Sequence, residues 1–353
     1  MFGAAVRVAA PRCSCATIRT LTTGRTETIT VFDRNAKLMQ KERAAAREDI
    51  HLYDYLKEEV GYRLSERIHD IKNEFRVGLD LSCGRGQLAK HITETSLQKL
   101  YMSDFSPGLL AQAHVPQADG LSVEKLCINE ESKLPFEDEH LDIVLSNLSL
   151  HWVNNLPGCL REVLRTLKRD GVLLAAMLGG DTLYQLRSSL LLAEMERRGG
   201  ISAHVSPFTE TQDVGALLTN AGFTLLTVDT EDITVGYPSM FELMWDLQGM
   251  AENNANLSRQ LHLSRDTCMA AAAIYQEMYG DEEGIPATYQ VIYMIGWKPN
   301  PEKRAEAPAR GSGQISLKDL SRLEELVKQQ GVDGKLKFMH EMENANSHDD
   351  NKK

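Results

Sequence analysis

The segment that most constrains the fold spans residues 77–86 and reads Val-Gly-Leu-Asp-Leu-Ser-Cys-Gly-Arg-Gly. Its first half, residues 77–81, is a short apolar run typical of a buried strand, and a glycine-rich loop follows it. A second apolar run at residues 99–102 is closed by Asp104. A strand, a tight loop, a helix, a second strand and an acid in this order are suited to binding a nucleoside cofactor.

The loop itself narrows the kind of cofactor. Gly84 and Gly86 let the backbone pass close to a ligand, and Asp104 can accept hydrogen bonds from ribose hydroxyls. A dinucleotide fingerprint needs a third glycine three residues after Gly84, where this chain has Gln87, and a first glycine where it has Ser82. The spacing therefore excludes the NAD or FAD pattern. A tight turn with no ligand is the alternative explanation of the loop alone.

Short strands and helices alternate along the chain, which predicts βαβ units in a mostly parallel sheet. After residue 180 the pattern changes to helices, two β-like segments and helical insertions before the last of them. The helix at 239–251 is rich in Met and aromatic residues, so it is either core or a capping or docking surface. Strands are expected at 77–81, 99–102, 121–128, 141–147, 171–178, 223–235 and 287–297, and helices at 87–94, 107–114, 156–168, 181–198, 209–221, 239–251 and 264–279.

The N-terminus has the composition of a mitochondrial transit peptide, which we assign to residues 1–28. It is rich in Ser and Thr and carries no acid before Glu27. It lacks the continuous apolar stretch of a secretory signal; an unstructured end with no targeting role is the alternative. Its arginines are Arg7, Arg12, Arg19 and Arg25.

Charge and cysteine content exclude several classes of protein. The formal net charge is −11, which disfavours non-specific nucleic-acid binding and suits an enzyme with a small cofactor or a basic protein partner. No apolar run is long enough for a membrane-spanning helix. The six cysteines show no C-x-x-C spacing, so neither a zinc site nor a disulfide framework is expected.

Further motifs point to a family. An acid-x-Gly-x-Gly-x-Gly pattern is met at Asp80, Gly84 and Gly86, with Ser82 in the first glycine position. If that position has φ > 0, Ser82 costs about 1 kcal/mol of strain. Together with the segments at 134–136, 141–144 and 146–152, the chain resembles class I S-adenosylmethionine (SAM)-dependent methyltransferases, in particular the group that includes the malonyl-carrier-protein methyltransferase of biotin synthesis.

The resemblance implies a set of cofactor contacts. Asp80 and the 83–86 backbone would hold the methionine part of SAM, Glu130 would recognise the adenine, and Asn147 would line the pocket. The expected cofactor-binding residues are Asp80, Ser82, Cys83, Gly84, Gly86, Asp104, Glu130 and Asn147.

Motifs outside the loop give a closer resemblance, to the family of mitochondrial complex I assembly factor 5. It covers roughly residues 29–298 and implies hydroxylation of an arginine on an iron–sulfur subunit of complex I. It also implies a matrix protein, peripheral to the matrix face of the inner membrane, that works with other assembly factors. The motifs lie at 32–34, 53–60, 149–154, 179–184, 206–208, 241–244, 246–250 and 286–289.

The expected organisation follows from these boundaries. A helical extension at 29–74 precedes a methyltransferase-like domain at 75–298. Residues 299–353 are rich in Pro, Gly and charge and are expected to be a linker and a largely disordered tail, with one short helix near 316–329.

Four residues are candidates for the chemistry. His151 and Trp152 follow the fourth strand and should lie at the mouth of the pocket, and Asp181 and Tyr184 follow the fifth. His151 is either a base or substrate contact, or a packed, hydrogen-bonded residue. Asp181 is either a substrate contact or a helix cap.

No metal site is predicted. Hydroxylation often uses two His and a carboxylate, and His140, Asp142 and a distant His204 have that composition. Asp142, however, opens the fourth strand of the methyltransferase pattern. The metal for hydroxylation, and the way oxygen is activated, are therefore not identified by the sequence.

Three functions remain open from the sequence. The first is an arginine hydroxylase, from the resemblance. The second is a SAM-dependent methyltransferase of a small-molecule or carboxyl substrate, from the fold. The third is a catalytically silent assembly chaperone that retains SAM for stability.

Overall fold

The chain divides into two compact units, one ending at Lys298 and one beginning at Pro299. Of the second unit the structure describes little beyond the 3-10 helix η4 (Pro301–Lys303). The expected transit peptide at 1–28 and the expected helix and tail beyond residue 303 lie outside the described residues. The computed structural model describes residues 30–71, 73–92, 97–118 and 120–303.

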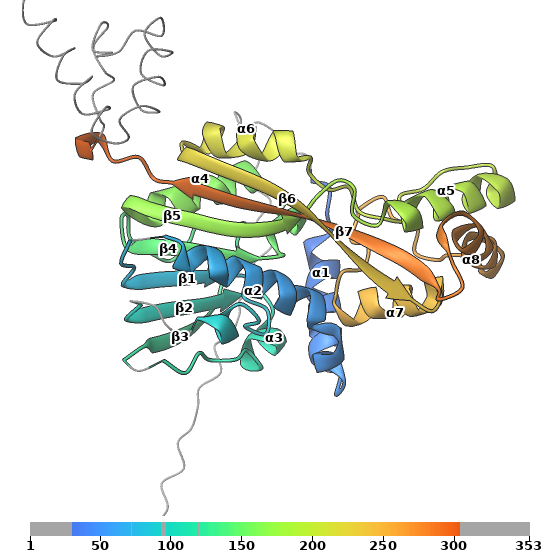
Figure 1. Cartoon of the computed structure of the whole chain (residues 1–353), viewed down its shortest axis with the longest axis horizontal. Helices are drawn as coiled ribbons and strands as arrows, with labels where there is room; N and C mark the ends of the chain where they lie inside the picture. Colours follow the sequence, from blue (N-terminus) through green and yellow to red (C-terminus); the bar gives the residue numbers. More distant parts are fainter. Residues whose placement is uncertain (1–29, 72, 93–96, 119, 304–353) are drawn as a thin grey trace, which may run out of the picture. The chain divides into compact units, whose positions relative to one another are not determined.

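One sheet of seven strands forms the centre of the first unit, in the order β3-β2-β1-β4-β5-β7-β6 (Figure 1). Strands β1 to β5 are parallel, and β7 runs antiparallel to both of its neighbours. This confirms the predicted α/β class I methyltransferase sheet. The strands are β1 (Val77–Leu81), β2 (Lys99–Asp104), β3 (Ser122–Cys127), β4 (Leu141–Asn147), β5 (Leu167–Leu178), β6 (Thr224–Tyr237) and β7 (Ile285–Trp297).

Helices cover both faces of the sheet, which explains why its central strands are apolar runs rather than alternating ones. On one face, α4 (Leu156–Thr166) and α6 (Thr211–Ala221) pack on residues such as Val144 and Leu173. On the other, α2 (Tyr55–His69) packs across β4 and β5. The middle of the sheet is therefore fully buried and holds the strand ends in fixed places.

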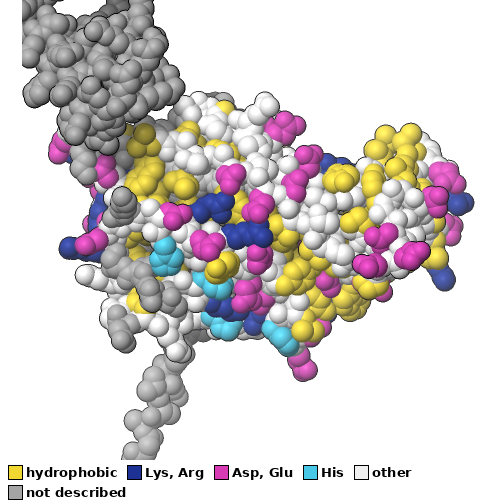
Figure 2. Space-filling view, viewed as in Figure 1, with side chains coloured by type: hydrophobic (Ala, Val, Ile, Leu, Met, Phe, Trp, Pro, Cys, Tyr) yellow, Lys and Arg dark blue, Asp and Glu magenta, His cyan; other side chains and the backbone are white. Residues whose placement is uncertain are grey.

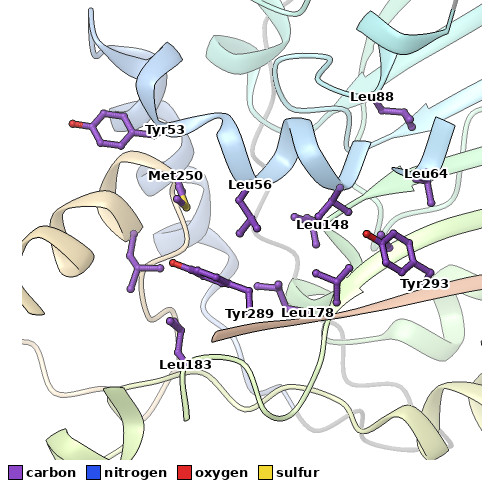
Figure 3. Packing of buried hydrophobic residues seen from close by; sticks show 14 of the residues in the cluster. Tyr53, Leu56, Leu64, Leu88, Leu148, Leu178, Leu183, Met250, Tyr289 and Tyr293 are labelled. Carbon is purple, nitrogen blue, oxygen red and sulfur yellow. The ribbon is translucent and has the colours of Figure 1, made fainter. Parts of the chain in front are cut away.

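Helix α2 has an apolar stripe along one face. Leu56, Val60, Leu64 and Ile68 recur every four residues and are all buried. Side chains at i and i+4 lie on one helical face, so this face packs against the sheet. Figure 3 shows Leu56 and Leu64 beside Leu148 within this cluster.

The β6–β7 ribbon extends past the parallel strands and carries the helical additions (Figure 1). Helices α7 (Met240–Gly249) and α8 (Arg265–Tyr279) lie between its strands in sequence, and α8 packs on α5 (Tyr184–Arg198). These are the predicted insertions before the last strand. Helix α7 buries Leu243 but exposes Trp245, so it is both core and surface; hydrophobic side chains show at this end of the molecule in Figure 2.

The segment after the glycine loop differs from the prediction. A helix was expected at 87–94, but the described part has turns and the single 3-10 turn η2 (Ala89–His91). Tertiary contacts compete with the helix here: the Arg85 carbonyl accepts the His114 N–H at 2.9 Å, and the Gln87 side chain donates to Asp54 at 2.7 Å.

The remaining short elements complete the unit. The N-terminal helical segment begins with α1 (Arg34–Ala45) and η1 (Ile50–Tyr53), and α3 (Pro107–Ala111) and η3 (Leu150–Trp152) follow β2 and β4. Within the described ranges, no helix has the length and apolar character needed to cross a membrane.

Candidate functional site

The glycine loop lies at the carboxyl end of β1 and has a left-handed backbone at three positions. Ser82, Gly84 and Gly86 have φ of 59°, 58° and 72°. A Cβ on Gly86 would lie 2.7 Å from the His114 carbonyl oxygen, so no side chain fits there. Ser82 takes the strained conformation expected of it, which costs about 1 kcal/mol and is typical of a functional position.

Buried polar atoms at the ends of β1 and β4 lack partners among the described residues. They are both carboxylate oxygens of Asp80, the Ser82 hydroxyl and the Asn147 side-chain oxygen. Burial, with Asp104 nearby, raises the pKa of Asp80 to about 8. Unsatisfied buried polar atoms are costly, so this group is arranged for a polar ligand rather than for stability.

Asp104, at the end of β2, is fully buried but well satisfied. Its oxygens accept from the backbone N–H groups of Gly84 and Ser106, at 3.0 and 2.8 Å. Lys41 of α1 donates to both oxygens, at 3.0 and 3.1 Å. The expected ribose acid therefore already holds a cation from the N-terminal helix.

Glu130, the expected adenine acid, lies in the loop after β3 and is also paired. Arg34 of α1 donates to it at 2.7 Å, while its second oxygen is without a partner in the described structure. The Arg34 and Lys41 side chains lie 4.5 and 4.6 Å from the centre of the Phe105 ring.

Most of these residues line one hollow at the carboxyl edge of the parallel strands, where open α/β sheets bind ligands. Cys83, which also lines it, is buried, and burial raises the pKa of its thiol well above the usual value. Asp80, Gly86 and Asp104 are not among the lining residues. The hollow is lined by Arg34, Lys37, Lys41, Lys57, Ser82, Cys83, Gly84, Gln87, Phe105, Leu109, Glu130, Asn147, Leu148, Ser149, Trp152 and Glu252.

A stripe of cations on α1 forms one wall of the hollow, and none of its members was predicted from the sequence. Arg34, Lys37 and Lys41 are spaced by three and four residues, which places them on one helical face. Each contacts a different acid. This spacing could have indicated a cationic wall from the sequence, although a charged helical face normally lies against water.

Glu252, the second missed residue, follows α7 and is the centre of a buried cluster. It accepts from the Trp152 indole N–H at 2.7 Å and pairs with Lys57 at 3.2 Å and Lys37 at 3.6 Å. Burial alone would raise the pKa of Glu252, but Lys37 and Lys57 outweigh it and hold the pKa well below the usual value. The carboxylate is therefore ionised.

His151 is part of the same cluster, with both ring nitrogens engaged. Its Nδ1 accepts from the Leu178 N–H at 3.4 Å, which leaves the proton on Nε2, 3.3 Å from Glu252. Burial lowers the pKa of His151, so the ring is neutral. This geometry indicates that His151 positions Glu252 rather than acting as a base.

The other two candidates lie elsewhere. Asp181 and Tyr184 precede and begin α5 and do not line the hollow. The Asp181 carboxylate accepts from the Gln290 amide at 3.2 Å and does not cap α5. Tyr184 is 42% exposed, with its ring edge-on to Tyr279. Of the four chemical candidates, the structure thus brings together only His151 and Trp152.

The three residues weighed as a metal triad are also apart. Asp142 accepts from the backbone N–H groups of residues 76 and 77, and His204 contacts Glu194 at 3.0 Å. His140 stacks on Phe136. No group of three or more potential metal ligands occurs in the part of the chain that the structure describes.

Comparison with known proteins agrees with the fold. A family profile described as "Methyltransferase domain" matches residues 79–175. A "Malonyl-[acyl-carrier protein] O-methyltransferase" from Methylovorus sp. is 29% identical over 250 residues, covering 69% of this chain and 82% of the relative.

Two other relatives are much more similar, and both are named "Arginine-hydroxylase NDUFAF5, mitochondrial". The protein from Homo sapiens is 48% identical over 301 residues, which cover 85% of this chain and 86% of the relative. The protein from Danio rerio is 47% identical over 301 residues, covering 85% and 92%. The resemblance predicted from the motifs is confirmed, and the chain belongs to this family of mitochondrial arginine hydroxylases built on a methyltransferase fold.

Proposed function

We propose that this chain hydroxylates an arginine on an iron–sulfur subunit of complex I during assembly of the complex. The observation that carries the proposal is the membership of the arginine hydroxylase family over most of the chain. The buried carboxylate Glu252 beside the Trp152 ring gives the hollow a place for a cation, in keeping with that activity. The net charge of −11 also suits a basic substrate segment.

The hollow is proposed to bind SAM. The unpartnered oxygens of Asp80, Ser82 and Asn147 fit the ammonium and polar groups of a methionine moiety, and the free oxygen of Glu130 fits an adenine amine. Asp104 would take the ribose hydroxyls, which compete with Lys41 for its oxygens. When bound, SAM supplies a sulfonium whose methyl group can be transferred.

The chain's own residues have separate parts in this proposal. The positive φ of Gly84 and Gly86 lets the loop backbone approach the cofactor, and Cys83 lines the hollow beside Gly84. Glu252, oriented by His151 and Trp152, supplies a fixed negative charge on the opposite side. A preorganised carboxylate of this kind orients a cationic side chain without reorganising.

Location and partners belong to the proposal as well. The relatives are named mitochondrial. We place the chain in the matrix, peripheral to the inner membrane, with residues 1–28 as its presequence and other assembly factors as partners. We further propose 29–74 as a helical extension, 75–298 as the methyltransferase-like domain and 299–353 as a linker and tail.

Methyl transfer to a small-molecule or carboxyl substrate is the second candidate, because the methyltransferase domain profile matches the strands that form the hollow. A silent assembly chaperone is the third, because cations of α1 occupy the expected ribose and adenine acids.

Mass spectrometry of the complex I iron–sulfur subunits separates the three functions. Cells lacking this chain should lose a modification with the mass of one oxygen atom on an arginine, and the chain should restore it. Loss of a methyl group instead would favour the second function. No change in either modification would leave the chaperone or methylation of a small molecule.

SAM binding is tested by calorimetry on a matched pair of variants. Gly84→Asp adds a side chain and an anion to the loop at a backbone φ of 58°, so we expect a loss of affinity. Gly215→Asp on α6, where a Cβ meets no atom within 4 Å, is the control and should bind as the unmodified chain does. Equal affinity of the two variants would contradict the assignment of the loop.

A further inference from the structure

We infer that Trp152, Glu252 and the Ala251 carbonyl form a cage that binds the guanidinium group of the substrate arginine, and that Lys37 of α1 occupies this cage in its absence. The inference rests on the proposed function and deepens it, since it assigns the place where the substrate side chain binds. It also assigns α1 the role of a removable occupant.

The geometry around the Lys37 ammonium is that of a cation site with three walls. The nitrogen lies 3.3 Å from the centre of the Trp152 ring, within cation–π range. It donates to the Ala251 carbonyl at 2.5 Å and lies 3.6 Å from the Glu252 carboxylate. An aromatic face, a carboxylate and a carbonyl each attract a cation.

The cage is rigid, because other residues hold its walls. The Trp152 indole N–H donates to Glu252, and His151 contacts the same carboxylate. The Trp152 ring is also packed edge-on against Phe32 at a centroid distance of 5.2 Å. Glu252 keeps Lys57 as a second partner, so the loss of Lys37 does not leave its charge unpaired.

A guanidinium suits this cage better than the ammonium that fills it. A guanidinium is planar, stacks on an indole, and can donate to a carboxylate and a carbonyl at the same time. It also keeps its charge when buried, whereas burial holds the pKa of Lys37 well below the usual value, against the opposing effect of Glu252. The ammonium is therefore the weaker occupant.

Helix α1 is held in a way that permits its removal. Its buried residues are Lys37, Lys41, Ala44 and Ala45, so no large apolar side chain anchors it. Two of its ion pairs go to Glu130 and Asp104, the acids proposed for the adenine and ribose. The helix also accepts hydrogen bonds through Glu42 and donates one through Gln40 to the Asn254 carbonyl. A cofactor that takes those acids competes with α1 and so favours the release of Lys37.

The cage also lies where a substrate should meet the cofactor. Lys37, Trp152 and Glu252 line the same hollow as Ser82 and Asn147, at the carboxyl ends of β1 and β4. An arginine inserted there would be adjacent to the proposed methionine end.

The test is calorimetric binding, to the full chain, of a pentapeptide with one arginine between glycines. The matched peptide carries citrulline, which has the same shape without the charge. Lys37→Met removes the occupant, and we expect it to tighten binding of the arginine peptide about tenfold, since the open fraction of sites sets the apparent affinity. The citrulline peptide should stay weak with every variant.

Lys99→Met is the matched control. Lys99 lies 4.4 Å from the centre of the Tyr101 ring and 2.9 Å from Glu124. The Lys99 and Glu124 side chains are 37% and 49% exposed, and neither lines the hollow. The Lys99→Met variant should bind the arginine peptide as the unmodified chain does. An equal change with Lys37→Met and Lys99→Met, or no preference of the Lys37→Met variant for arginine over citrulline, would overturn the inference.

Glu252→Gln gives a second test that does not depend on Lys37→Met folding. Glu252→Gln should weaken arginine-peptide binding about tenfold, and Glu252→Asp should recover part of the lost affinity. Melting curves followed by circular dichroism check that the variants fold. The cage and the proposed function can fail separately in cells that lack this chain. If the unmodified chain and the Glu252→Gln variant restore the oxygen modification equally, the cage is wrong and the proposed function stands. If the chain restores nothing but the arginine peptide still binds selectively, the proposed function fails and the cage stands.

Discussion

Helices α1 and α2 both belong to the N-terminal segment and both pack near the sheet, yet they are held by opposite chemistry. Helix α2 buries an apolar stripe that includes Leu56, Val60 and Leu64. Helix α1 buries two lysines and two alanines, and its cations meet acids in the hollow. An apolar interface is stabilising because it removes surface from water, whereas a buried ion pair roughly offsets its own desolvation. The α2 face is thus suited to stability, and the hollow under α1 is suited to the ligand exchange proposed above.

The largest effect should come from the apolar face. Leu64→Ala leaves a cavity in a fully buried place on α2 and should lower the free energy of unfolding by about 3 kcal/mol. Chemical denaturation measures this. Leu52→Ala is the control; Leu52 is 61% exposed, and its loss should cost about 0.5 kcal/mol or less. Similar losses in the two variants would remove the contrast between the regions.

The Asp80→Asn substitution at the hollow should instead raise the free energy of unfolding. Because burial raises the pKa of Asp80 to about 8, the folded chain holds a proton that the unfolded chain has lost above about pH 4. Stability is therefore lost as the pH rises from about 4 to 8, and Asp80→Asn should remove this loss. The variant should be more stable than the unmodified chain at pH 8, and the difference should shrink toward pH 5.

Denaturation curves at the two pH values check this, with the exposed Asp232→Asn as control. The control should leave the difference between the two pH values unchanged. A loss of stability in Asp80→Asn at pH 8 would mean that Asp80 supports the fold rather than a ligand.

The backbone strain in the hollow gives a smaller effect. Ser82→Gly relieves a φ of 59° and removes a hydroxyl with no partner among the described residues, so it should gain about 1 kcal/mol. Ser103→Gly, within the extended strand β2, should instead lose about 1 kcal/mol. Thermal melting of both variants is the measurement, and shifts in the same direction would argue against strain at Ser82.

The smallest effect on global stability should come from Lys37→Met, at less than about 1 kcal/mol, because Glu252 keeps Lys57 and the Met side chain still fills the space. Hydrogen exchange should nevertheless become faster in α1 and stay unchanged in α2, since local opening follows local contacts. A loss near that of Leu64→Ala would show that α1 is held as firmly as α2.

Much of the fold was predictable from local patterns. The apolar runs at β1, β4 and β5 and the stripe on α2 follow from periodicity, which burial on one or two faces imposes. The glycine loop followed from the backbone conformation that Gly84 and Gly86 allow. The helix expected at 87–94 was wrong in extent, because the carbonyl of Arg85 bonds to His114 on a distant segment, which local propensity cannot reveal.

Local patterns were enough to predict that the ends of β1, β2 and β4 bring Asp80, Asp104 and Asn147 together, because parallel strands end at the same edge of a sheet. The rest of the hollow depends on tertiary packing. Glu252 enters the hollow from beyond α7 and Lys37 from α1, and no periodicity links two positions so far apart in the chain. Asp181 and Tyr184, which follow a strand as Trp152 does, lie outside it. Local patterns predict where the strands lie along the chain, but the pairing of buried charges depends on which distant segments pack together.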